Sequence, residues 1–117
     1  MQQKRINIQD LERNSYKAML TMDSYVKNSQ MPEFFRELIK RRASQINGCA
    51  YCIDMPPDAA LALGETERRI FALSAWKESP LFSEEERAVL QLTEEMTLIS
   101  KNGVSDETYG KVLKFFG

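Results

Sequence analysis

Histidine is absent from the chain of 117 residues, and cysteine occurs only twice, at Cys49 and Cys52. The side chain that most often moves protons near neutral pH is therefore missing. A structural zinc site needs four ligands, so two subunits would have to share four thiolates across a two-fold axis to complete one. Haem attachment requires a histidine directly after the second cysteine, where the chain has Ile53. The sequence predicts no cofactor, and metal binding is the weaker interpretation of the cysteine pair.

An excess of charge of either sign is also missing, because 16 Lys and Arg residues face 17 Asp and Glu residues, for a net charge of -1. So balanced a surface gives no electrostatic footprint for nucleic acid or for an anionic membrane. No apolar run reaches the length of a membrane span, and the first residues lack the apolar core of a signal peptide. We therefore expect a cytoplasmic protein that binds neither nucleic acid nor membrane.

Strand-like alternation is absent, whereas apolar residues recur at helical spacing along nearly the whole chain. The pattern predicts an all-α fold with short loops, and the length suits a single domain, 1–117. The predicted helices cover residues 11–26, 32–47, 49–63, 65–76, 84–102 and 106–116.

Local signals mark several ends of these helices. Asn47-Gly48 favours a left-handed stop after the second helix. Ser83 followed by Glu86 predicts a capping box, and Ser105 is a predicted cap of the last helix. The helix that follows Ser83 presents one predicted apolar stripe, made of Val89, Leu90, Thr93, Met96 and Ile99.

The two cysteines lie three residues apart, so their thiols can close a disulfide within one helical turn. Gly48 before Cys49 indicates that the pair lies at the start of a helix, where free N–H groups stabilise a negative sulfur. The preceding basic run, residues 40–42, adds positive potential. In the cytoplasm such a pair is typical of redox chemistry or metal binding rather than of a structural crosslink. Redox chemistry is the favoured interpretation, with metal binding and inert thiols as the alternatives.

Glu37 lies twelve residues before Cys49 on the second predicted helix. If the chain turns back after Asn47, its carboxylate could approach the thiols as a proton acceptor. The alternative is an exposed salt bridge with Arg41 at i+4, which the spacing alone favours.

The motif Ser-Gln-Ile-Asn-Gly-Cys-Ala-Tyr-Cys at 44–52, with Ala-Leu-Gly-Glu-Thr at 62–66 and Ala-Trp-Lys-Glu-Ser-Pro-Leu-Phe at 75–82, resembles the alkylhydroperoxidase D-like branch of the carboxymuconolactone decarboxylase family. The resemblance covers most of residues 30–115. It implies a compact helical antioxidant domain that assembles as a homo-oligomer, a trimer or a hexamer.

The resemblance further implies a peroxidase in which Cys52 attacks the hydroperoxide and Cys49 resolves the oxidised thiol. The family's relay glutamate falls on Glu37, which raises its candidacy above the salt-bridge interpretation. The expected electron donor is a thioredoxin-like or a lipoylated protein.

Two departures from the family pattern change the expectation. Pro56 occupies the position of the family's relay histidine, and proline cannot carry a proton. Positioned acid–base groups typically contribute about 10²- to 10⁴-fold in rate, so we expect a weakened peroxidase. In addition, family members usually continue past the equivalent of Gly117 with another apolar helix, so we expect either a truncated form or one that relies on a neighbouring subunit.

Two other functions remain as hypotheses. One is a non-enzymatic descendant of the family, either a redox sensor or an oligomeric binding protein, which kept the fold and thiols without turnover. The other is lactone decarboxylation, which makes no use of the cysteine pair and ranks lowest because no histidine can move protons.

Overall fold

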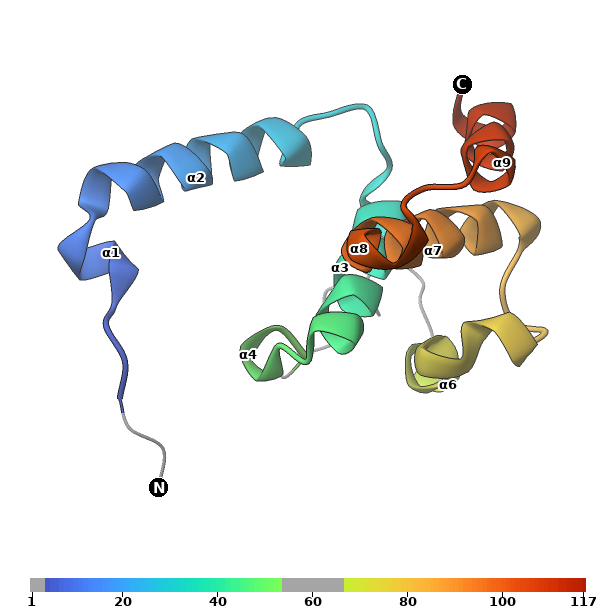
Figure 1. Cartoon of the computed structure of the whole chain (residues 1–117), viewed down its shortest axis with the longest axis horizontal. Helices are drawn as coiled ribbons and strands as arrows, with labels where there is room; N and C mark the ends of the chain where they lie inside the picture. Colours follow the sequence, from blue (N-terminus) through green and yellow to red (C-terminus); the bar gives the residue numbers. More distant parts are fainter. Residues whose placement is uncertain (1–3, 54–66) are drawn as a thin grey trace. The chain divides into compact units, whose positions relative to one another are not determined.

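The computed structural model describes residues 4–53 and 67–117, and every regular element in these two ranges is a helix (Figure 1). The prediction of an all-α fold is confirmed. None of the helices in the described ranges is long and apolar enough to cross a membrane. The elements are α1 (Ile8–Leu11), α2 (Arg13–Lys27), α3 (Glu33–Asn47), α4 (Ala50–Ile53), α6 (Glu67–Ala72), the 3₁₀ helix η1 (Leu73–Glu78), α7 (Glu84–Thr97), α8 (Ile99–Asn102) and α9 (Asp106–Phe116).

The chain forms two compact units, Met1–Met31 and Pro32–Gly117. The first contains α1 and α2, and the side chain of Asn7 caps α1 by accepting a hydrogen bond from the backbone N–H of Gln9 at 3.0 Å. The second contains the remaining helices and the hydrophobic core. That 1–117 forms one family domain stays a prediction.

The core of the second unit is formed by α3, η1 and α7 together with the loop after η1. Its buried side chains come from α3, from η1, from the loop after η1 and from α7: Leu38, Leu73, Trp76, Phe82 and Leu90. Burying side chains of this size contributes about 1.5–3 kcal/mol each, so this cluster stabilises the unit substantially. Helix α9 packs on α7 and completes the scaffold.

Three predicted helix ends are confirmed. Gly48 ends α3 with a φ of 65°, in the left-handed region that glycine adopts most readily. At the start of α7 the side chain of Ser83 accepts from the N–H of Glu86, whose carboxylate accepts from the N–H of Ser83, so the capping box is complete. Ser105 caps α9 by accepting from the N–H of Thr108.

Two predicted helices are interrupted. The segment predicted as one helix over 65–76 is α6 followed by η1, with a non-helical backbone at Ala75. The predicted helix 84–102 breaks at Leu98 into α7 and α8. The predicted stripe stays buried only as far as Thr93: Met96, still within α7, is 58% exposed, and Ile99, after the break, is 57% exposed. Of the predicted helix 49–63, α4 covers the start, and its continuation lies outside the described residues.

Candidate redox site

The end of α3 determines where the cysteines lie. The backbone N–H of Gly48 donates to the carbonyl of Gln45 at 3.2 Å, and that of Cys49 donates to the carbonyl of Ser44 at 3.0 Å. These two bonds satisfy carbonyl groups that the last turn of a helix would otherwise leave without partners. The left-handed residue then turns the chain, and α4 begins at Ala50. Cys49 is therefore held directly against the C-terminal end of α3.

Cys49 and Cys52 form a disulfide with 5.3 Å between their Cα atoms. Both residues are half-buried, so the sulfurs are neither sealed in the core nor fully in solvent. The backbone N–H of Cys52 donates to Sγ of Cys49 at 3.3 Å, as a donor in the first turn of α4. The predicted position of the pair at the start of a helix is confirmed, and this N–H would stabilise negative charge on the Cys49 sulfur when the bond is reduced.

Glu37, the third predicted site residue, lies on α3 with its side chain 24% exposed. Its carboxylate forms an ion pair with Nζ of Lys40 at 3.9 Å. Within the part of the chain that the structure describes, no hydrogen bond joins Glu37 to Cys49 or Cys52. Pro56 lies outside the described residues. The roles of Glu37 and of the two cysteines thus remain predictions.

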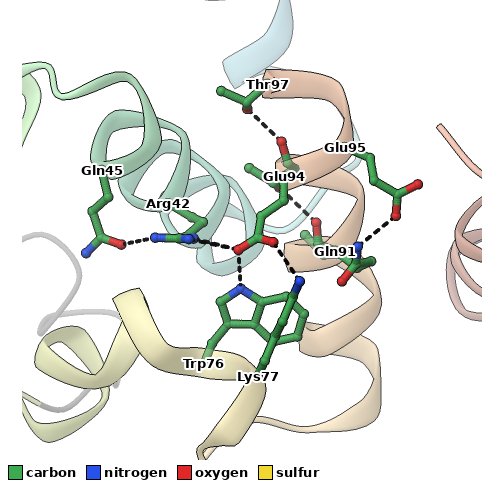
Figure 2. Close-up of polar contacts among 10 residues, drawn as sticks. Arg42, Gln45, Trp76, Lys77, Gln91, Glu94, Glu95 and Thr97 are labelled. Atoms are coloured by element: carbon green, nitrogen blue, oxygen red, sulfur yellow. Dashed lines mark hydrogen bonds and ion pairs between the residues drawn. The ribbon is translucent and has the colours of Figure 1, made fainter. Parts of the chain in front are cut away.

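Glu94 of α7, which was not among the predicted site residues, contacts Arg42, Trp76 and Lys77 through its carboxylate (Figure 2). One carboxylate oxygen accepts from Nε and Nη2 of Arg42 at 3.1 and 2.8 Å and from Nε1 of Trp76 at 2.9 Å. The other oxygen pairs with Nζ of Lys77 at 3.1 Å. Burial would raise the pKa of Glu94, but the bonds from Trp76, Arg42 and Lys77 outweigh it and hold that pKa below its usual value.

This cluster connects the part of α3 that precedes the cysteines to the core. Arg42 also donates from Nη1 to the side chain of Gln45 at 3.0 Å, on the last turns of α3 before Cys49 (Figure 2). Glu94 compensates the charge of Arg42. Within the basic run 40–42, Arg42 therefore holds α3 against α7 and does not add positive electrostatic potential at the thiols. No local pattern could have found the pair, because 52 residues separate its members.

A second buried ion pair fixes the start of α7. Arg69 of α6 donates to both carboxylate oxygens of Glu86 and to the carbonyl of Leu81, and its guanidinium lies over the rings of Phe34 and Phe82. Burial would raise the pKa of Glu86, yet the bonds from Arg69 and Ser83 lower it overall. The capping glutamate thus also ties α6 to α7.

The match to known proteins agrees with this fold. Residues 14–95 match the model of the carboxymuconolactone decarboxylase family, and the chain belongs to that family. A solved structure, that of ATU0492 from Agrobacterium tumefaciens, superimposes with a TM-score of 0.92 at 36% identity over 98% of this chain and 79% of that one. That protein is described as being of unknown function and as a proposed antioxidant defence protein AhpD. The prediction of an AhpD-like fold is confirmed.

Two relatives known from their sequences are similar to this chain, one over most of its length and the other over a part of it. The uncharacterized protein YdfG of Bacillus subtilis is 44% identical over 112 residues, which are 96% of this chain and 76% of YdfG. The uncharacterized protein YnjA of Escherichia coli is 31% identical over 68 residues, 58% of this chain and 37% of YnjA.

Proposed function

We propose that this protein is a thiol-dependent antioxidant that reduces hydroperoxides through the Cys49–Cys52 pair. The observation that supports the proposal is the disulfide itself, which closes between half-buried sulfurs at the start of α4. A bond that closes so short a loop contributes little to the stability of a fold, so a chemical role explains the pair better than a structural one. The likeness to a proposed AhpD protein points to the same chemistry.

The reaction begins from the dithiol. The Cys52 thiolate attacks the O–O bond of the hydroperoxide, forms a sulfenic acid, and releases the alkoxide, which takes up a proton to become the alcohol. The Cys49 thiol then attacks the Cys52 sulfur, so that the disulfide forms and water leaves. A dithiol donor, in the cell a thioredoxin-like or a lipoylated protein, reduces the disulfide and is itself oxidised. The short spacing allows resolution before the sulfenic acid is oxidised further.

Proton movement is the weak part of this site. We assign Glu37 as the acceptor of the thiol proton, and Pro56 stands where the family relay has a histidine. We therefore expect turnover below that of a complete relay, by a factor on the order of 10² or more. We place the protein in the cytoplasm as a homo-oligomer, a trimer or a hexamer, and treat 1–117 as a single family domain.

The missing histidine also supports a second candidate. A redox sensor or an oligomeric binding protein would need the disulfide to form and be reduced, but it would not need rapid proton transfer. This candidate predicts stoichiometric oxidation of the pair and background consumption of peroxide.

Steady-state reduction of cumene hydroperoxide with dihydrolipoamide as donor separates the two candidates. The comparison uses the wild-type protein and the variants Cys52→Ser, Cys49→Ser and Pro56→His, with Ser100→Ala on α8 as a matched control away from the cysteines. We expect measurable wild-type turnover that is lost in Cys52→Ser, and increased turnover in Pro56→His.

Background rates in the wild type, with activity appearing only in Pro56→His, would assign the protein to the sensing or binding class. Wild-type turnover that survives in both cysteine variants would contradict a role for the thiols altogether.

A further inference from the structure

A cavity of about 350 Å³ lies between η1, α7 and α9, and no residue of α4 lines it. Cavities of roughly 300 Å³ and above are large enough to hold small organic ligands. The wall combines apolar surface from Trp76, Ala88 and Phe115 with three cationic side chains, Lys77, Arg87 and Lys111. One carboxylate, that of Glu84, also lines it. Since Lys77 and Lys111 pair with Glu94 and Glu107, Arg87 is the cation of this wall that has no carboxylate partner among the described residues.

Arg87 is the most informative of these cations. Its Nη1 donates to the carbonyls of Trp76 and Ser79, both at 3.1 Å, and its Nη2 donates to the carbonyl of Lys77 at 2.7 Å. These bonds hold the guanidinium in one place with neutral partners only. Within residues 4–53 and 67–117, no carboxylate lies within ion-pair distance of Arg87, and its Nε donates no hydrogen bond. A half-buried positive charge thus keeps part of its hydrogen-bonding capacity for another group.

The chemistry of the wall indicates what that group is. A guanidinium presents pairs of parallel N–H donors that match the two oxygens of a carboxylate. The guanidinium of Arg87 and the ammonium of Lys77 lie 5.4 and 5.7 Å from the centre of the Trp76 ring, which is buried, and the half-buried Phe115 provides the more exposed apolar side chain of the wall. A ligand that satisfies both features has an anionic head and an apolar body.

We propose that this cavity binds a small amphipathic carboxylate, with the carboxylate at Arg87 beside Lys77 and Lys111 and the apolar body against Phe115. The proposal concerns a site separate from the cysteine pair and does not depend on peroxide reduction. The two lysine side chains are more than half exposed and form ion pairs with Glu94 and Glu107 at 3.1 and 3.2 Å, so they add to the attraction of an anion while Arg87 provides the main contact.

Octanoate and its neutral analogue octanamide test the proposal directly. Titration of the protein, followed by the fluorescence of Trp76 and by calorimetry, should give saturable binding of octanoate with one site per chain. Because the anionic head provides the contacts to the cations, octanamide should bind at least tenfold more weakly. Raising the salt concentration should weaken octanoate binding and leave octanamide binding nearly unchanged.

Variants of the exposed lysines locate the site, and urea denaturation of each variant checks that the fold is kept, because Lys77 also pairs with Glu94. Lys111→Gln changes a side chain that is 60% exposed and should weaken octanoate binding several-fold. The double variant Lys77→Gln, Lys111→Gln should bind octanoate more weakly still. Lys101→Gln on α8, outside the cavity, is the matched control and should bind as the wild type does.

Absence of saturable binding, equal affinity for octanoate and octanamide, or unchanged affinity in the Lys77→Gln, Lys111→Gln double variant would overturn the proposal. Competition by inorganic phosphate at the same concentrations as octanoate would also overturn it, because an apolar body would then contribute nothing.

Discussion

The indole Nε1 of Trp76 donates a 2.9 Å hydrogen bond to the carboxylate of Glu94. The same carboxylate oxygen holds the guanidinium of Arg42, so one side chain of α7 collects donors from η1 and α3 at the edge of the core. Only 14% of the Glu94 side chain is exposed, and its charge is balanced entirely by these neighbours and Lys77. The relationship explains why a glutamate can lie beside the hydrophobic cluster.

Replacing Glu94 by alanine should therefore destabilise the protein more than the loss of a surface charge would. The variant leaves Nε and Nη2 of a largely buried guanidinium and an indole N–H without their acceptor, and breaking a buried pair in this way costs on the order of 3 kcal/mol. Urea denaturation measures the change. Glu107→Ala, which removes an exposed ion pair with Lys111, is the control and should change stability very little. Equal effects in the two variants would show that the Glu94 cluster adds nothing beyond an ordinary surface pair.

Acid should weaken the contact between α7 and the start of α9. Glu95 accepts hydrogen bonds from the hydroxyl of Thr108 and the backbone N–H of Ser105, and these lower its pKa from 4.5 to about 2. Since the folded-state pKa is the lower one, the stabilisation is fully present above about pH 4.5 and is lost as pH falls toward 2.

The variant Thr108→Val isolates this effect. At pH 7 it should lower the free energy of unfolding by about 1–2 kcal/mol, because a charged acceptor loses a donor. The difference from the wild type should shrink as pH falls below 4.5, and an NMR titration should find the pKa of Glu95 raised in the variant. A difference that stays constant down to pH 3, together with an unchanged pKa, would contradict the assignment.

Two glycines should respond to alanine in opposite directions. Gly48 has a φ of 65°, and an added Cβ would meet no atom within 4 Å, so only the left-handed backbone opposes the change. Gly48→Ala should cost about 1–2 kcal/mol. Gly110, inside α9, also has open space around it, and Gly110→Ala should add roughly 0.5–1 kcal/mol because alanine favours the helix. Thermal unfolding should give a lower Tm for Gly48→Ala and a higher Tm for Gly110→Ala. A change of Tm in the same direction in both variants would refute this account of the α3 end.

Glu37→Gln tests whether this carboxylate moves a proton. If it accepts the thiol proton, the variant should lose about 10²-fold or more in kcat/KM for hydroperoxide reduction, and the pH dependence of the rate should change. Lys40→Gln, which removes the same ion pair from the other side, serves as the matched control. Similar small losses in both variants would assign Glu37 to the ion pair alone.

The sequence was sufficient wherever a few adjacent residues decide the structure. Asn47-Gly48, the box of Ser83 and Glu86, and the cap at Ser105 each satisfy backbone groups within a few residues, so their effect is local. The cysteine motif likewise predicted both the helix start at the disulfide and the family.

Features that depend on distant contacts were not predictable in the same way. Apolar residues continue at helical spacing through Leu98, but the helix ends there. Periodicity shows which residues are apolar, and it does not show where tertiary packing ends a helix. The partners of Glu94 come from segments 18 and 52 residues away, and a glutamate on a helix is ordinarily a surface residue. The basic run 40–42 likewise predicts positive potential at the thiols, because the partner of Arg42 lies 52 residues away and no local pattern reveals it.

The ion pair between Arg42 and Glu94 also has a consequence for folding. Its formation closes a chain segment of 52 residues, whereas the caps and helical turns on either side form from neighbours in the sequence. The entropy lost on closing a loop rises only with the logarithm of its length, but it must be overcome before α3 and α7 gain from contact. Docking of these two helices should therefore be the late and slow event in folding, after the helices themselves have begun to form.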